Sequence, residues 1–182
     1  MAIKTMSASV GGSSFEEGWH EATVNKAEYG VYETVTGDSK TFLDIWFEGY
    51  PDSMNLRVYE VHNKTTKEEF NIANIFKYAN AGIVSMLKDP NGKHPIMQYD
   101  DDAKGLIGKS INILMYKDPK NPKYSRILDR IAPIVQEGEH LSFTATDVDS
   151  IKRSADKSLA NKLAAMPSPN GAVTSEPFAN QF

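Results

Sequence analysis

Aromatic and basic side chains alternate with apolar ones in several segments of this chain, at the two-residue spacing of a β-strand. If Leu43 faces a core, then Phe42 and Trp46 face outward. Exposed rings offer stacking surfaces to nucleic-acid bases, and Lys or Arg side chains contact phosphates. The pattern predicts nucleic-acid contacts at Phe42, Trp46, Arg57, Tyr59, Tyr116, Lys117, Lys120, Lys123, Tyr124 and Arg126.

Positive charge is concentrated in one part of the chain, although the formal net charge is −4. The segment from Lys104 to Arg130 contains seven Lys or Arg residues and two Asp residues. Within it, Pro119 and Pro122 stiffen a loop that carries Lys120 and Lys123. Local clustering of charge matters more than the total when the partner is a polyanion. The segment therefore favours contact with a nucleic acid.

The same aromatic residues have a second interpretation. Large rings in small β-domains often fill the core, and Phe42 and Trp46 then form a hydrophobic layer beneath a helix. Asp44 and Glu48 share the predicted face of Trp46, and their negative charges disfavour DNA phosphates on that face. From the sequence alone both interpretations stay open for these two rings.

Residue patterns typical of enzymes are missing from the sequence. The four histidines lie far apart, no phosphate-binding or nucleophile motif is present, and the chain contains no cysteine. Asp100, Asp101 and Asp102 are the one acidic cluster that suggests Mg²⁺, and acidic runs are more often solvated loops. We therefore expect no enzymatic activity and no cofactor, with a metal-dependent nuclease as an alternative.

The order of predicted elements indicates a mainly β fold with an inserted helix, of the α+β class. Strands are predicted at 19–29, 41–47, 54–61, 109–117 and 124–131, with helices at 66–82 and 147–166 and a short helical turn at 83–88. The strand alternation predicts a buried row of Leu43, Ile45, Phe47, Leu56 and Val58. Three strands, a helix and two strands form the order of an OB-fold, a five-stranded Greek-key barrel.

Composition divides the chain into three parts. Residues 1–14, rich in Ser and Gly, are expected to be a flexible N-terminal segment, and residues 15–135 the OB-fold domain. Residues 136–182 are expected to form a partly helical or disordered, flexible C-terminal tail, in which Phe178 and Phe182 are predicted to bind a partner protein. No signal peptide or membrane-spanning run is visible, so we expect a cytoplasmic protein without membrane contact.

Several of these features together resemble phage-encoded OB-fold single-stranded DNA-binding proteins. They are the order of elements, the run Leu106-Ile107-Gly108-Lys109-Ser110-Ile111, the lysine-rich hairpin after it and the aromatic C-terminus. The resemblance implies binding of single-stranded DNA without sequence preference, in phage DNA replication or recombination and in the host bacterial cytoplasm. It also implies that the tail recruits replication or recombination enzymes.

Carried over by position, the resemblance places DNA contacts on Trp46, Arg57, Tyr59, Tyr116 and the hairpin from Lys117 to Arg126, with Phe182 as the handle for a partner. One feature departs from the family, whose tails are strongly acidic: residues 167–182 contain a single acid, Glu176. The alternative function is a protein-interaction module that binds a host or replication enzyme without touching DNA.

Overall fold

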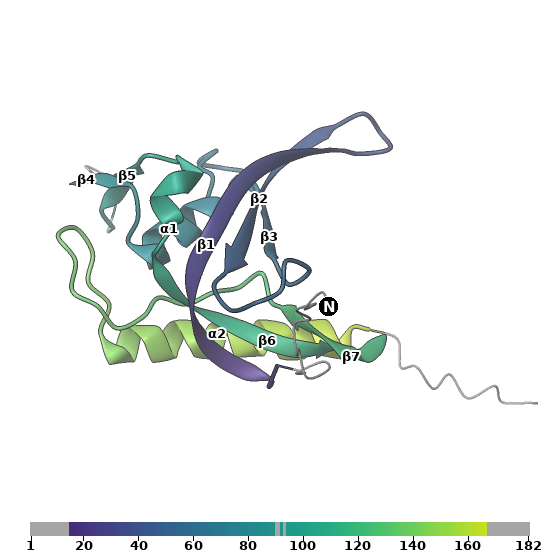
Figure 1. Cartoon of the computed structure of the whole chain (residues 1–182). Coiled ribbons are helices and arrows are strands. Elements are labelled where there is room, and N and C mark those ends of the chain that lie inside the picture. The colour runs from purple at the N-terminus through teal and green to yellow at the C-terminus, as the bar shows by residue number, and fades with distance from the viewer. Residues whose placement is uncertain (1–14, 90–91, 93, 167–182) are drawn as a thin grey trace, which may run out of the picture.

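The computed structural model describes residues 15–89, 92 and 94–166, and within them it shows a mainly β protein of the α+β class (Figure 1). The strands are β1 (Gly18–Glu33), β2 (Ser39–Phe47), β3 (Leu56–Tyr59), β4 (Ile83–Leu87), β5 (Ile96–Tyr99), β6 (Ser110–Asp118) and β7 (Asn121–Ile127). The helices are α1 (Asn71–Ala79), α2 (Ala145–Ala164) and a short 3₁₀ helix, Ala103–Leu106. The segment 1–14 and the predicted partner contacts Phe178 and Phe182 lie outside the described residues.

Five strands form one antiparallel sheet in the order β3-β2-β1-β6-β7, and β4 pairs with β5 in a separate hairpin. The long strand β1 joins the two halves of the larger sheet, because its first half pairs with β6 and its second half with β2. A register shift between Val24 and Lys26 accompanies this change of partner, and such irregularities bend a strand. Figure 1 shows β1 curving across the molecule, so that the sheet wraps around a core while β3 and β7 remain its two edges.

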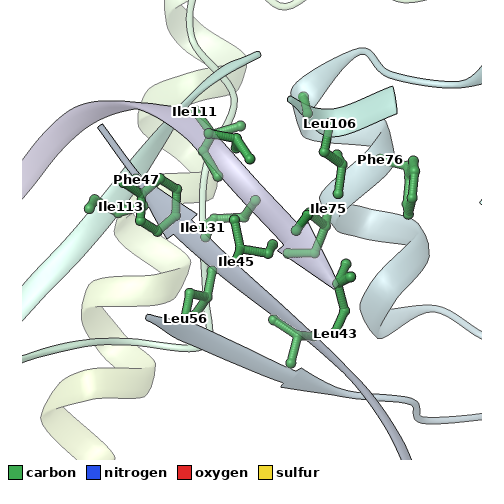
Figure 2. Close-up of a cluster of buried hydrophobic side chains, with 14 of the residues drawn as sticks. Leu43, Ile45, Phe47, Leu56, Ile75, Phe76, Leu106, Ile111, Ile113 and Ile131 are labelled. Atoms are coloured by element: carbon green, nitrogen blue, oxygen red, sulfur yellow. The ribbon is translucent and has the colours of Figure 1, made fainter. Parts of the chain in front are cut away.

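The core lies on the concave side of this sheet. Leu43, Ile45 and Phe47 are at most 2% exposed, as the strand alternation predicts, and Leu56 and Val58 of β3 are equally buried. Figure 2 shows side chains from α1 meeting the strand residues across the core. The helix contributes Ile72, Ile75 and Phe76, which are all buried. The inserted helix therefore closes one end of the curled sheet.

Helix α1 begins at Asn71, and the predicted start near Thr66 is wrong. The Asn63 side chain accepts hydrogen bonds from the backbone N–H groups of Thr65 and Thr66, which holds this stretch in a turn. The Glu69 carboxylate instead accepts from the first three backbone N–H groups of the helix at 2.8–2.9 Å. A carboxylate at this position satisfies free donors and complements the helix dipole.

The predicted helical turn at 83–88 is also wrong, because Ile83–Leu87 forms strand β4. Its pairing with β5 satisfies the backbone, and the Tyr99 ring of β5 packs on Phe76 with the ring centroids 5.2 Å apart. Gly82 precedes the strand with a φ of 62°, and an added Cβ would lie 2.3 Å from the Asp100 carbonyl oxygen. The pairing with β5 thus determines the conformation of this segment, whose local pattern suits either a helix or a strand.

Helix α2 confirms the helix predicted at 147–166. It packs on the convex face of the large sheet, whereas the sequence placed this segment in a C-terminal tail. Thr144 and Asp147 form a capping box at its start. The Trp19 indole donates a hydrogen bond to Asp156 at 2.9 Å. The helix covers a second apolar cluster made of Leu114, Tyr116, Leu128, Ala155, Trp19 and Leu159. Of the helices in the described part, none is long and apolar enough to cross a membrane.

Candidate nucleic-acid interface

A groove of about 870 Å³ lies between the two edge strands of the sheet, β3 and β7, and reaches the C-terminal end of α2. We call it the β3–β7 groove. It is lined by predicted contact residues from both edges, namely Arg57, Tyr59, Tyr116, Lys123, Tyr124 and Arg126, and also by Lys162 of α2, Asp129 and Phe15. Residues that are far apart in sequence thus meet in one concave surface where the sheet is not closed.

On the β3 side of the groove, Arg57 is held in a fixed orientation. Its Nε and Nη2 donate hydrogen bonds to the two oxygens of Asp44 at 2.8 and 2.6 Å. The guanidinium lies 3.8 Å from the centroid of the Phe42 ring, and that ring contacts Tyr59 edge-on. The hydrogen bond to Asp44 raises the pKa of Arg57. Because the Arg57 side chain is still 43% exposed, it offers a charged, flat surface to a ligand.

The β7 side of the groove repeats this arrangement. Arg126 donates to the Asp118 carboxylate at 2.6 Å, and its side chain is 61% exposed while that of Asp118 is 10% exposed. The second Asp118 oxygen accepts the backbone N–H of Lys120 at 2.9 Å, inside the β6–β7 turn. Each side of the groove therefore presents an arginine that a nearly buried aspartate holds in place. Such a side chain loses less conformational entropy when a ligand binds than a mobile side chain does.

The lysines at the groove provide charge that no acid in the described part of the chain neutralises. Lys123 and Lys162 line the groove and form no ion pair among those residues, and Lys120 is exposed in the adjoining β6–β7 turn. The ammonium of Lys162 lies 5.4 Å from the centroid of the Tyr116 ring. Four cationic side chains and one acidic side chain, Asp129, line the groove. The surface thus favours an anionic ligand even though the whole chain is acidic.

Tyr116 lies at the groove, but its ring is not available as a stacking surface. It is 5% exposed and packs beneath α2 in the second apolar cluster. The sequence expectation for this residue assumed that the convex face of β6 is open to solvent. Because α2 covers that face, the exposed rings that line the groove are Tyr59 and Tyr124, which are 39% and 63% exposed.

Lys117 also differs from the sequence expectation, because its ammonium is already engaged. It donates to the Phe15 carbonyl oxygen at 3.3 Å and to the Ser125 hydroxyl at 2.9 Å. The Phe15 ring stacks on Tyr50 with centroids 4.8 Å apart. Lys117 therefore fastens the beginning of the described chain to β7, beside the groove, and is not a free cation for a phosphate.

Trp46 and Phe42 lie on the outer face of β2, and neither lines the groove. The Trp46 indole donates to the Asp52 carbonyl oxygen at 3.1 Å, and Lys26 lies over its ring. Phe42 supports Arg57 and lies against Gly30, where an added Cβ would meet the ring at 2.3 Å. Phe42 thus acts on the groove through Arg57.

Several residues that shape the groove were not predicted from the sequence: Asp44, Asp118, Phe15, Asp129 and Lys162. A signal existed for Asp44, since it lies opposite Arg57 in the β2–β3 register. Asp118 lies opposite Asn121 and not opposite Arg126, so its contact with Arg126 does not follow from strand register. No local signal places Phe15 or Lys162, which come from opposite ends of the described chain and meet the groove only through packing.

The acidic run at 100–102 has a structural role at the start of the 3₁₀ helix. Asp100 accepts the backbone N–H of Asp102 at 3.0 Å, and Asp102 accepts that of Lys104 at 3.0 Å. Among residues 15–89, 92 and 94–166, no group of three or more His, Asp or Glu side chains is arranged to hold a metal ion. These carboxylates thus act as turn and cap acceptors.

We expect Asp118 to titrate below its ordinary value of 3.8. The Lys120 backbone N–H and then the Arg126 guanidinium favour the charged carboxylate and lower the pKa of Asp118. Its stabilising contribution is therefore complete above pH 3.8 and is lost as the pH falls through the lowered pKa. An NMR titration of the carboxyl carbon measures the midpoint. In Arg126→Gln the midpoint should rise but stay below 3.8, because the Lys120 contact remains; a wild-type midpoint at or above 3.8 would contradict the geometry.

Comparison of the sequence with protein-family models and with curated proteins gives no match. The features of the β3–β7 groove are two fixed arginines, unpaired lysines among the described residues and two exposed tyrosines, all between the edges of one curled sheet. This combination of flat rings and cations suits a flexible polyanion that carries flat groups.

Proposed function

We propose that this protein binds single-stranded DNA without sequence preference, in the β3–β7 groove. The observation that carries the proposal is the meeting of cations and exposed tyrosines from both sheet edges in one groove of about 870 Å³. In a single strand the base faces are free to stack on Tyr59, Tyr124 and the fixed Arg57 plane, whereas in a duplex they are stacked on each other. Stacking contributes about 1–3 kcal/mol per base and needs no particular sequence.

The cations of the groove would follow the DNA backbone. Lys123, Arg126 and Lys162 line it on the β7 and α2 side, opposite Arg57 on β3. Contacts of this kind release counterions from the strand, so that affinity falls steeply with salt. We therefore expect low base specificity, strong salt dependence and no catalytic step.

The strand order supports a more specific proposal for the fold, a partly open OB-fold. The order β3-β2-β1-β6-β7, with α1 between β3 and β6, corresponds to a five-stranded Greek-key barrel whose last pairing, between the third and fifth strands, is missing. OB-folds bind oligonucleotides on the face of their second and third strands, and here Arg57 lies on that face. A role in phage replication or recombination, in the host cytoplasm and with tail-bound enzymes, is part of this proposal through the family resemblance.

The direct test is fluorescence anisotropy of a labelled oligo-dT strand titrated with the protein at two salt concentrations. We expect binding that weakens with salt, together with quenching of tyrosine emission from the groove. A duplex of equal length is the control and should bind much more weakly. Equal affinity for strand and duplex, or no binding at the lower salt concentration, would refute the proposal.

A second candidate function, a protein-interaction module, is favoured by exposed apolar side chains away from the groove. Val84, Leu87 and Ile96 of the β4–β5 hairpin are 64%, 44% and 42% exposed. Exposed apolar groups close together often mark a protein contact. If this is the main function, a complex with a host or replication enzyme should persist after nuclease treatment, and the anisotropy titration should show no DNA binding.

A further inference from the structure

A second, smaller cavity lies beside the β3–β7 groove, between α1 and α2. Asp129 lines both cavities. The Asn71 side chain of this second cavity donates a hydrogen bond at 2.9 Å to the carbonyl oxygen of Tyr59, a groove residue. On α2, Ser158 of the second cavity precedes Lys162 of the groove by one helical turn. The two cavities therefore adjoin each other at Asp129, and we call the second the α1–α2 crevice.

The size and walls of the crevice suit one flat ring. Its volume is about 160 Å³, and a cavity of roughly 150 Å³ holds a benzene-sized molecule. Ile75, Ile151 and Ala155 form apolar parts of the wall, while the polar parts include the amides of Asn71 and Asn74. An apolar enclosure with a few polar groups fits a ligand with flat apolar faces and a polar edge, as a nucleobase has.

The charged groups of the crevice define which base would fit. Asp129 is an acceptor only, so it disfavours a phosphate and favours a base that carries an exocyclic amino group. Arg130 also lines the crevice and forms no ion pair within the described residues, so it can donate to a ring nitrogen or carbonyl. Cytosine has an amino donor beside two acceptors, whereas thymine places a carbonyl oxygen where the amino group would be.

We propose that the α1–α2 crevice takes one base of the bound single strand and prefers cytosine to thymine, with Asp129 as the specificity-determining residue. This inference rests on the proposed function, since the strand must first occupy the β3–β7 groove. The groove binds any sequence by stacking and charge, and the crevice adds a composition preference at one position of the strand.

The test compares the affinities of oligo-dC and oligo-dT of equal length at neutral pH, by anisotropy, for the full chain and three variants. Wild type should bind oligo-dC roughly tenfold more tightly. In Asp129→Asn the two affinities should come within about twofold, because an amide can donate to thymine as well as accept from cytosine. Ser154→Phe, which fills the crevice from an exposed position, should remove the preference and leave oligo-dT binding unchanged. The control Ala160→Phe, exposed on α2 and outside both cavities, should keep it.

The outcomes separate this inference from the function on which it rests. Binding of neither oligomer would refute the proposed function. Equal binding of both by wild type, or a preference that survives in either Asp129→Asn or Ser154→Phe, would refute the inference and leave the function standing. A further measurement uses dCMP alone. If dCMP binds as tightly as oligo-dC, then the crevice is a site for a free nucleotide and the proposal is wrong. A much weaker affinity for dCMP supports the proposal that the base belongs to a bound strand.

Discussion

Replacing Lys120, Lys123 and Lys162 together by Gln is expected to lower the affinity for oligo-dT about 100-fold at about 0.1 M salt. Each phosphate contact with a single strand contributes roughly 0.7 to the slope of log K against log salt. Loss of three contacts should therefore reduce the slope by about 2. At about 0.1 M salt, a change of 2 in this slope corresponds to a change of about two orders of magnitude in affinity. Anisotropy titrations at several salt concentrations give both quantities.

The choice of lysines follows from the ion pairs at the groove. Removing Arg57 or Arg126 would leave Asp44 or Asp118 nearly buried without its guanidinium, so a loss of binding would be mixed with a loss of stability. The three lysines form no ion pair in the described part of the chain. Their replacement changes charge with little effect on folding.

A matched control removes the same number of positive charges elsewhere. Lys64, Lys88 and Lys104 are exposed and line none of the cavities described above, so their replacement by Gln gives the same net charge. We expect this control to lower affinity only a few-fold, through the general field. If the two triple variants bind equally well, then the groove is not the binding site.

Phe76→Ala should lower the free energy of unfolding by about 3–5 kcal/mol. The ring is fully buried, with 0% exposure, where α1 closes the end of the sheet, and it packs on Tyr99 of the β4–β5 hairpin. Its removal costs the transfer free energy of the ring and leaves a cavity. Chemical denaturation, followed by far-ultraviolet circular dichroism, measures the change.

Phe70→Ala is the control for this experiment. Phe70 precedes the same helix and is 41% exposed, so its loss should cost less than about 1 kcal/mol. The pair separates burial from helix propensity, because both changes replace the same residue type in or beside α1. Similar destabilisation by both variants would contradict the placement of Phe76 in the core.

Strand alternation by itself determined much of the sheet. The period of two in residues 41–47 predicted that Leu43, Ile45 and Phe47 are buried, and the structure confirms it. The prediction succeeds because successive side chains of a strand point to opposite faces. Once the buried apolar row is identified, the outward-facing residues between its members are identified as well. The outward position of Arg57 and Tyr59 on β3 follows in the same way.

Local patterns were misleading where backbone groups have competing partners. The spacing of Thr66 and Glu69 resembles a capping box, yet Asn63 takes the amides of the turn and Glu69 caps a helix that begins later. The segment 83–88 carries apolar residues that suit either a helix or a strand. Its pairing with residues 96–99, which lie nine to sixteen positions away in the register, decides the outcome.

The groove depends on contacts that no short segment contains. The strand faces that carry aromatic and basic residues can be predicted from the sequence, because alternation is a local property of an extended chain. Long-range packing, in contrast, makes β3 and β7 the facing edges of the groove, and it lets α2 bury Tyr116 while bringing Lys162 to the groove. An apolar helix face is buried only where it finds a surface to pack against, and the partners of Ala155 outside α2 in the second apolar cluster lie 27 residues or more before it in the chain.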